Sequence, residues 1–239
     1  DNARVYMDTN RGETDLTRLV LFNPDTKQEE IVESDPQNEV DFGGAIFSEK
    51  TDELVGTTYV GDRTRTYFRD PAYRSDFALV TKRLPGREVE IAGATADDRL
   101  WMVVSSGDTE PGERYIFDRE RKTLTKQYRI RERLPREHLA RMAPIRYASS
   151  DGLRIPAYLT LPRGVPARQL PLIVVPHGGP WARDTFGYNS MAQFLANRGY
   201  AVLMPNFRGS TGYGKKFLNA GNNEWGQKMQ DDLTWGVKH

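Results

Sequence analysis

The sequence has no cysteine among its 239 residues. Disulfide bonds and cysteine-ligated zinc sites are therefore excluded. No apolar run approaches the ~20 residues that span a bilayer, and the start of the chain, Asp1-Asn2-Ala3-Arg4, does not have the pattern of a signal peptide. We expect no membrane partner, and the sequence leaves the compartment open between cytoplasm and periplasm.

An excess of charge of one sign is also lacking. The chain has 34 basic and 33 acidic residues, which gives a formal net charge of +1, and no basic tract. Such a balance creates no field that attracts nucleic acid, so no nucleic-acid partner is expected. The histidines and carboxylates show no metal-ligand spacing, and we expect neither a metal nor a cofactor.

Short apolar runs separated by polar turns fill the first half of the chain. Turn-forming residues such as Asn23-Pro24-Asp25 and Gly107-Asp108-Thr109 stand between them. This spacing predicts strands joined in antiparallel hairpins. The predicted strands are Arg18–Phe22, Ala45–Phe47, Leu54–Val60, Phe77–Thr81, Leu100–Val104 and Arg114–Phe117.

An internal repeat organises these strands. Asp52 and Leu54, followed by Gly61-Asp62, recur 46 residues later as Asp98 and Leu100, followed by Gly107-Asp108. A repeat of about 40–50 residues with several strands per unit is typical of β-propeller blades. Two similar hairpins in an ordinary β-sandwich are the alternative.

Two further segments have the pattern of the outer hairpin of a blade. They begin at Phe22 and Phe117, each continues through a polar turn, and their second strands are predicted at Glu29–Val32 and Thr123–Ile130. About three blades fit into residues 1–130, whereas propellers usually close with about four to eight. A third, weaker copy of the repeat starts the chain with Val5-Tyr6-Met7, Arg11-Gly12-Glu13 and Leu19–Phe22. Because this copy begins mid-pattern, we expect a partial propeller that lacks N-terminal sequence.

Residues 131–142 are highly charged and fit no blade pattern, so we interpret them as an interdomain link with a short helical turn from Pro135 to Met142. A hairpin is predicted next, from Pro144–Ala148 and Ile155–Leu161. The link therefore separates the all-β blades from a second domain over residues 143–239.

The remainder of this second domain has an α/β order. The continuous apolar runs Leu170–Val175 and Ala201–Met204 are typical of buried parallel strands. Helical spacing at Met191, Phe194 and Leu195 predicts a helix between them. A final helix is predicted from Trp225, Met229, Leu233 and Val237. Strands alternating with helices in this way favour an α/β domain.

The loop after the first buried strand carries candidate chemistry in His177, Gly178, Gly179 and Pro180. Its two glycines let the backbone approach a ligand closely. A backbone N–H at the end of such a strand can point at a developing oxyanion, and loops of this kind supply one oxyanion donor in lipases and esterases. A plain strand-to-helix turn is the alternative, which the full strand and the His-Gly-Gly sequence disfavour.

No nucleophile accompanies this loop. Ser210 lies in a glycine-rich loop, but Arg208 stands where a Gly-x-Ser-x-Gly elbow needs glycine, and that motif occurs nowhere in the chain. We interpret Ser210 as a structural turn residue. His138 lies in the link and His239 ends the sequence, so neither has a catalytic context. The pair Asp231-Asp232 is interpreted as solvated or helix-capping.

Three blocks in the second half stand in a specific order: His177–Arg183, Asn206–Gly214 and Gly221–Asp232. Together they resemble the prolyl oligopeptidase family of serine peptidases, above all its acylaminoacyl-peptidase and bacterial dipeptidyl-peptidase branch. The resemblance implies β-propeller blades (all-β) that gate access, followed by the N-terminal part of an α/β-hydrolase domain. It implies hydrolysis of short peptides or acyl-aminoacyl peptides through a Ser-His-Asp acyl-enzyme.

By position, the resemblance assigns Gly179 as the backbone oxyanion donor, supported by Gly178, with Arg208 and Gly209 as structural residues near the site. Other branches place a tyrosine where His177 stands and use its hydroxyl, so here the backbone donor is favoured. The triad is expected beyond His239, and the chain alone is expected to be inactive.

The alternatives are an esterase or lipase and a non-catalytic propeller fragment that binds a partner. The expected partner is a peptide substrate, and both a homo-oligomer and association with a C-terminal fragment stay open.

Overall fold

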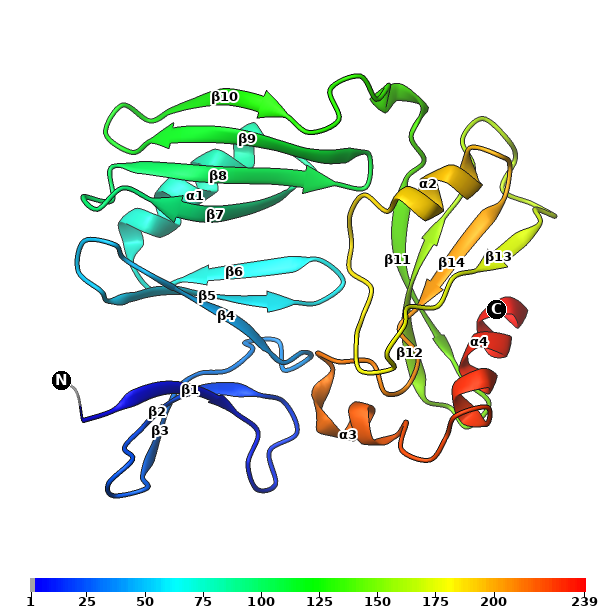
Figure 1. The fold of residues 1–239 in the computed structure, drawn as a ribbon, viewed down its shortest axis with the longest axis horizontal. Helices are drawn as coiled ribbons and strands as arrows, with labels where there is room; N and C mark the ends of the chain where they lie inside the picture. The colour runs from blue at the N-terminus through cyan, green and yellow to red at the C-terminus, as the bar shows by residue number, and fades with distance from the viewer. Residues whose placement is uncertain (1–2) are drawn as a thin grey trace.

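The computed structural model describes residues 3–239. Three antiparallel sheets come first along the chain, and a mixed sheet with helices α2, α3 and α4 follows them (Figure 1). The three antiparallel sheets lie one after another on one side of the molecule, and the mixed sheet lies on the other side.

The first three sheets are meanders of neighbouring strands. They contain β1 (Val5–Thr9), β2 (Arg18–Phe22) and β3 (Glu29–Glu33); β4 (Phe42–Phe47), β5 (Leu54–Val60) and β6 (Thr64–Phe68); and β7 (Glu88–Ala94), β8 (Leu100–Gly107), β9 (Glu110–Asp118) and β10 (Thr123–Arg129). We call them the first, second and third blades. They do not close into a ring.

The sequence repeat corresponds to equivalent turns in the second and third blades. Asp52 and Asp98 each have a φ of +57°, a left-handed conformation that aspartate tolerates better than most residues. Asp98 also ties the two blades together, because its carboxylate accepts hydrogen bonds from Ser48 Oγ at 2.5 Å and from the Glu49 N–H at 3.1 Å. Both aspartates thus serve a turn, and Asp98 also serves an interblade contact.

One predicted strand is wrong. Phe77–Thr81 lies inside α1 (Pro71–Arg83). Asp70 caps the first turn by accepting from the Tyr73 N–H, and Pro71 stands in the first turn, where proline suits a helix. Tyr73, Asp76 and Val80 are the buried residues of α1, which is a helical spacing that a short apolar window does not reveal.

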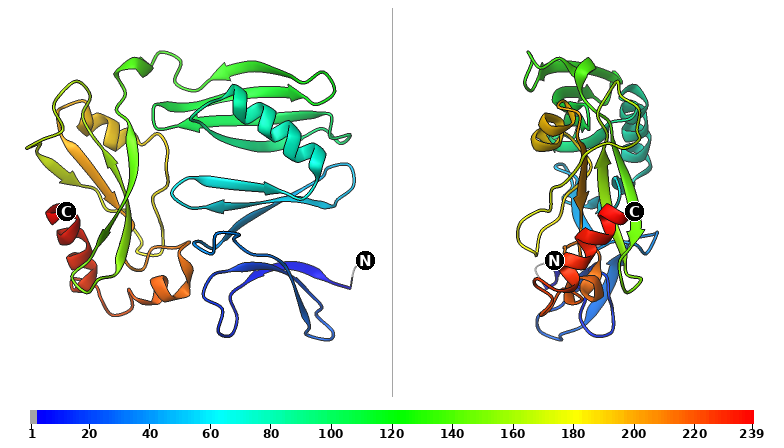
Figure 2. Two further views of the ribbon diagram at one scale, coloured as in Figure 1. Left: turned by 180° about the vertical axis from the view of Figure 1, so that it is seen from behind. Right: turned by 90° about the vertical axis from the view of Figure 1, so that its right-hand side faces the viewer.

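Helix α1 lies on one face of the third blade (Figure 2). The core between α1 and the second and third blades is largely aromatic, and Trp101 and Phe117 are fully buried at its centre. Arg119 places its guanidinium 4.2 Å from the centroid of the Tyr73 ring and 4.6 Å from that of Trp101, and it pairs with Asp76 at 2.9 Å. The paired and stacked arginine therefore joins α1 to the sheet that it covers.

Buried Glu113 on β9 makes the third blade sensitive to acid. Burial alone would raise the pKa of Glu113, but hydrogen bonds from Lys126, Tyr115 and Arg129 lower that pKa from 4.5 to about 2. A lowered carboxylate pKa contributes stability that is present above pH 4.5 and is lost as the pH falls towards 2. We therefore expect the wild-type chain to lose stability in this window.

The Glu113→Gln variant is expected to be less stable than wild type at neutral pH and to lose less stability on acidification. Urea unfolding midpoints followed from pH 7 to pH 2 measure both effects. Parallel curves for the two proteins below pH 4.5 would contradict this assignment.

The fourth sheet contains β11 (Met142–Ala148), β12 (Arg154–Thr160), β13 (Leu172–Val174) and β14 (Ala201–Pro205), in the order β11-β12-β14-β13. The predicted hairpin is present as β11 and β12, and β13 pairs in parallel with β14. α2 (Ser190–Ala196) connects these parallel strands, and α3 (Gly214–Asn219), which was not predicted, follows β14.

The predicted helical turn of the link is shorter than expected. It is the single 3-10 turn η1 (Arg136–His138), and Met142 already begins β11. Gln193 of α2 contacts the residues that follow η1. Its side chain accepts from the Ala140 N–H and donates to the Ala140 carbonyl, both at 2.8 Å, and it also donates to the Asp108 carbonyl at 3.0 Å. One side chain on α2 thus bonds both the turn between β8 and β9 of the third blade and the segment between η1 and β11.

The final helix is present as α4 (Lys228–Lys238), and of the four residues whose spacing predicted it Met229 is buried and Leu233 is partly buried. Val237 is exposed, and Trp225 is exposed and precedes the helix. Asp232 and Gly236, which the spacing did not include, are buried together with Met229. A Cβ at Gly236 would lie 2.7 Å from Tyr147 Oη, so the helix packs closely only because this residue is glycine.

Within residues 3–239, no helix is both long and apolar enough to cross a membrane.

Candidate active site

The loop of His177–Pro180 begins where β13 ends, beside the carboxyl end of β14. The Val175 N–H continues the pairing of the two strands by donating to the Leu203 carbonyl at 2.8 Å. Since β13 and β14 are parallel, the loops that follow them lie at the same edge of the sheet, which is where ligands bind in open α/β sheets. The fold thus brings two loops together: the first loop, residues 175–189, and the second loop, residues 206–213.

Gly179 occupies a backbone conformation that only glycine adopts easily. Its φ is +134°, and a Cβ there would lie 2.7 Å from the Trp181 nitrogen. Among the described residues 3–239, the N–H groups of Gly178 and Gly179 donate no hydrogen bond. Two free N–H groups at a strand end are available to an anionic oxygen.

The side chain of His177 faces the second loop. Its Nε2 lies 2.8 Å from Ser210 Oγ, its Nδ1 lies 2.9 Å from the Gly178 carbonyl oxygen, and its ring stacks on Phe207 with 4.6 Å between centroids. Because these contacts hold the imidazole inside the pair of loops, the free donors of the first loop are those of its backbone.

Ser210 forms a serine–histidine pair that superficially resembles a catalytic dyad. Its Oγ is fully buried and donates to the Phe207 carbonyl at 2.6 Å. The direction of its contact with His177 Nε2 depends on the histidine tautomer, but a fully buried hydroxyl presents no surface at which it could attack a substrate carbonyl. The geometry supports a structural role for Ser210.

Arg208 lies at the centre of a buried charge cluster beneath the second loop. Its Nε and Nη2 donate to the Asp232 carboxylate at 2.9 and 2.8 Å, and its own backbone N–H donates to the same carboxylate at 2.9 Å. Ser149 Oγ also donates to Asp232, at 2.5 Å. Arg208 is 3% exposed and Asp232 is 0% exposed. This geometry favours a structural role for Arg208.

The interpretation of Asp231-Asp232 as a solvated or capping pair is wrong for Asp232. Its carboxylate is fully buried because Arg208 neutralises it, whereas Asp231 contacts only the exposed hydroxyl of Ser150, at 3.1 Å. Asp151 completes the cluster with two bonds of 2.9 Å from Arg208, which hold the pKa of Asp151 well below its usual range. Nothing in the sequence pattern pointed to Ser149 or Asp151.

Gly209 lets the second loop pack against α4. Its φ is +93°, and a Cβ there would lie 3.0 Å from Met229 Cε.

Asn206 was also missed, and it joins the two loops. It is fully buried. Its side-chain oxygen accepts from the Asp184 N–H at 2.7 Å, and its nitrogen donates to the Asp184 carbonyl at 3.0 Å. The Asn206 amide therefore satisfies the backbone N–H and carbonyl of Asp184, as the backbone of a neighbouring strand would in a sheet. Burial raises the pKa of the Asp184 carboxyl, and the nearby His177 counteracts that rise.

The other two histidines belong to separate elements. His138 lies in η1, and His239 stacks on Tyr147 with 6.0 Å between ring centroids. In the part of the chain from residue 3 onward, no group of three or more histidine, aspartate and glutamate residues is arranged to hold a metal ion. The two loops thus hold free backbone donors, and this part of the chain contains no assembled Ser-His-Asp triad.

The sequence that contains these loops is similar to sequences of known proteins. Residues 186–239 match the sequence model of the prolyl oligopeptidase family. Over its whole length the chain is 38% identical to dipeptidyl aminopeptidase BIII of Pseudoxanthomonas mexicana. Residues 186–239 thus carry the sequence pattern of the prolyl oligopeptidase family, and the whole chain is similar to part of a dipeptidyl aminopeptidase.

Another relative within the prolyl oligopeptidase family is dipeptidyl peptidase family member 6 of Caenorhabditis elegans, which is 32% identical over 94% of the chain. The chain spans 36% of the length of the first relative and 33% of that of the second.

Solved structures of the prolyl oligopeptidase family confirm the predicted fold class. A puromycin-hydrolyzing peptidase of Mycobacterium tuberculosis matches all of the chain with a TM-score of 0.72 at 19% identity, and the chain covers 37% of it. A prolyl endopeptidase matches all of the chain with a TM-score of 0.70 at 18% identity, and the chain covers 35% of it. The chain therefore consists of β-propeller blades followed by part of an α/β-hydrolase domain.

Proposed function

We propose that the chain supplies the blades and the oxyanion loop of a serine peptidase that hydrolyses short peptides or acyl-aminoacyl peptides. In this proposal, residues 1–130 form a partial propeller, residues 131–142 form the link, and residues 143–239 begin the catalytic domain. The observation that supports it most directly is the free N–H of Gly179 at the end of β13, in a chain with dipeptidyl-peptidase relatives.

The proposed chemistry follows from the position of this N–H. When a serine attacks the scissile carbonyl, its oxygen becomes an anion, and a fixed N–H stabilises that charge without reorganising. Gly179 supplies one such donor, and Gly178 supports the turn that presents it. The second donor comes from the residue after the nucleophile. Because no Gly-x-Ser-x-Gly motif occurs in these 239 residues, the nucleophile would come from a longer protein that contains this chain.

Substrate turnover by such a longer protein tests the reaction class. Dipeptidyl- and acyl-aminoacyl-nitroanilides are expected to be hydrolysed at rates that exceed those of simple nitrophenyl esters of fatty acids. Hydrolysis of the fatty-acid esters alone would indicate an esterase and would overturn the proposal. The 239-residue chain serves as the negative control, because it is expected to hydrolyse neither substrate.

Labelling with a fluorophosphonate probe tests the assignment of Ser210. The Ser210→Ala variant of the longer protein is expected to label to the same stoichiometry as wild type, since this hydroxyl is buried and committed to Phe207. The 239-residue chain is expected not to label. Loss of labelling in a folded Ser210→Ala variant, or stoichiometric labelling of the 239-residue chain, would contradict the structural role of Ser210.

A further inference from the structure

Arg183 links the loop that carries Gly179 to the second blade. Its Nη1 donates to the Val60 carbonyl at 2.8 Å, and its Nη2 lies 3.3 Å from the Gly61 carbonyl. These two carbonyls belong to the turn between β5 and β6, whose tip faces the first loop in Figure 1. The arginine therefore crosses from the hydrolase part of the chain to the backbone of a blade.

The Arg183 guanidinium is also held by the second loop, in the hydrolase part of the chain. Nη2 donates to Tyr213 Oη at 2.7 Å, and the guanidinium lies 4.2 Å from the centroid of the Tyr213 ring. Gly212 leaves room for it, since a Cβ at that position would overlap Arg183. Asn206 donates to the same Tyr213 hydroxyl at 2.8 Å. Arg183 is thus fixed to the second loop and to the blade at once.

Three more contacts secure the β5–β6 turn on the hydrolase side. Tyr158 Oη donates to the Asp62 carbonyl at 3.1 Å, and Arg146 pairs with the Asp62 carboxylate at 3.0 Å. Arg63 of the turn places its guanidinium 4.3 Å from the centroid of the Phe186 ring, in the first loop. The β5–β6 turn of the second blade therefore contacts the hydrolase part through Asp62 and Arg63 as well as through Arg183.

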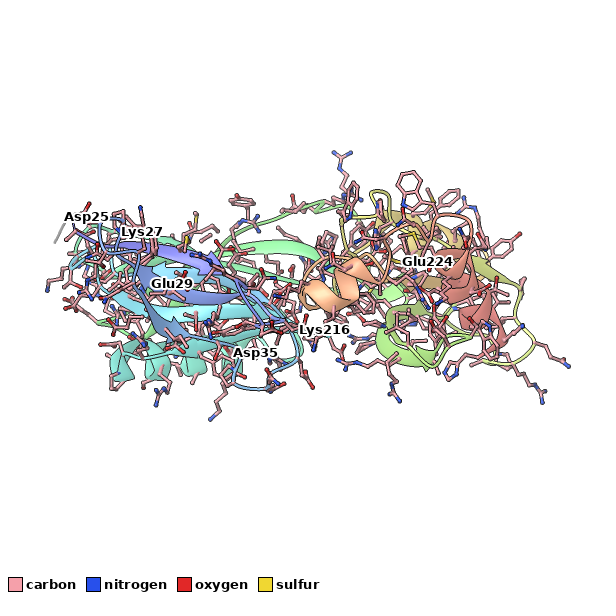
Figure 3. The ribbon with its side chains drawn as sticks, turned by 90° about the horizontal axis from the view of Figure 1, so that it is seen from below. Asp25, Lys27, Glu29, Asp35, Lys216 and Glu224 are labelled. Carbon is pink, nitrogen blue, oxygen red and sulfur yellow. The ribbon has the colours of Figure 1, made fainter. Side chains whose placement is uncertain are left out.

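Asp41, which lies between β3 and β4, and Asp15 of the first blade secure the second loop and α3 independently. The Asp41 N–H donates to the Gly212 carbonyl at 3.0 Å, and the Gly214 N–H donates to the Asp41 carboxylate at 3.2 Å. α3 has no side-chain cap of its own, and Asp15 of the first blade accepts from its Lys216 N–H at 2.7 Å. Figure 3 shows Lys216 on α3 beside the first blade. The blade supplies the helix cap that the hydrolase part lacks.

We propose that Arg183 is a positioning residue through which the docked second blade holds the Gly179 N–H in place. The first loop leaves its Gly178 and Gly179 N–H groups free, so other contacts hold its shape. These are the contact of His177 with Ser210, the bond from the Thr211 N–H to the Ala182 carbonyl, and the bonds of Arg183 and Asp184. A planar guanidinium that bonds two carbonyls and a hydroxyl fixes direction as well as distance. When the turn moves away, the guanidinium loses two acceptors and the loop loses this restraint. The inference rests on the proposed function, because it concerns the same oxyanion loop.

The kinetic test uses Arg183→Met and Arg183→Lys in the longer protein. A displacement of about 1 Å at a catalytic group costs about 10²-fold in rate, so Arg183→Met is expected to lower kcat by about 10- to 100-fold and to change KM little. Lysine can reach one carbonyl and is expected to restore part of the loss. Arg198→Met is the matched control, since Arg198 stacks on Phe194 of α2, 3.6 Å from the ring centroid, and donates to the Phe194 carbonyl. An unchanged kcat in Arg183→Met, or an equal loss in Arg198→Met, would overturn the proposal.

Hydrogen exchange provides a readout that does not depend on activity. In the 239-residue chain, Arg183→Met is expected to speed amide exchange in peptides that cover residues 177–187 and residues 60–64, and Arg198→Met is expected to leave both unchanged. Unchanged exchange in Arg183→Met would overturn the coupling of turn and loop. If wild-type longer protein hydrolysed no peptide while exchange responded as expected, the proposed function would fail and the coupling would stand.

Discussion

Asp232→Asn is expected to lower the free energy of unfolding by about 3–5 kcal/mol, the usual effect of removing one partner of a buried ion pair. Asp232 accepts from the Arg208 side chain, from the Arg208 backbone N–H and from Ser149 Oγ. Asparagine removes the charge and presents an NH₂ group to these donors. Arg208 would then keep only the half-exposed Asp151 as its counter-ion.

Urea unfolding followed by tryptophan fluorescence measures this loss. Asp231→Asn is the matched control, because the Asp231 carboxylate accepts from the exposed Ser150 hydroxyl at 3.1 Å, and a change below about 0.5 kcal/mol is expected there. A double variant, Arg208→Met with Asp232→Leu, is expected to be more stable than Asp232→Asn, because it leaves no unpaired charge in the interior. A loss under 1 kcal/mol for Asp232→Asn would show that the cluster is not what holds α4 to the second loop.

Gly179→Ala is expected to lower kcat of the longer protein by about 10²–10³-fold, the effect of losing one oxyanion donor. At a φ of +134° the added Cβ would lie 2.7 Å from the Trp181 nitrogen and 3.2 Å from the Ala182 nitrogen. Both are backbone atoms, so the loop itself must move. The displaced N–H would then miss the oxygen on which the negative charge develops.

Nitroanilide turnover at saturating substrate measures this effect, and thermal unfolding shows whether the variant remains folded. Gly199→Ala is a suitable control, since Gly199 also has a positive φ, of +91°, but a Cβ there meets no atom within 4 Å. It lies after α2, outside the two loops, and is expected to cost some stability while leaving kcat unchanged. A Gly179→Ala enzyme with wild-type kcat would remove Gly179 from the oxyanion site.

Elements whose patterns are local were predictable. The strands Arg18–Phe22 and Leu54–Val60 were predicted with the bounds that the structure has, because a short apolar run between turn formers depends only on adjacent residues. The repeat around Asp52 and Asp98 was also predictable from adjacent residues. In the structure both aspartates have the same φ, +57°. The first loop could be located because two glycines in the loop after an apolar strand indicate a backbone that approaches a ligand or another chain segment closely.

Elements whose residues are chosen by distant partners were not predictable. Phe77–Thr81 was predicted as a strand because a short apolar run does not reveal its period, and its helix is specified by Asp70 and Pro71 upstream. α4 was predicted, but the burial of Asp232 in it was not, because an aspartate becomes a core residue only beside a counter-ion such as Arg208. Asn206 and Asp184 carry no pattern that marks them as a pair.

The sequence by itself determined the order of the blades and of the α/β strands, and it located the loop with Gly179, since these follow from hydrophobic spacing and from the backbone freedom of glycine. Only the tertiary structure decided what holds that loop. Arg183, Tyr213, Asn206 and the β5–β6 turn are far apart in the chain. Hydrogen bonds to backbone carbonyls leave no trace in the identity of the residues that supply them, so the Val60 and Gly61 acceptors became visible only when the second blade was seen docked against Arg183.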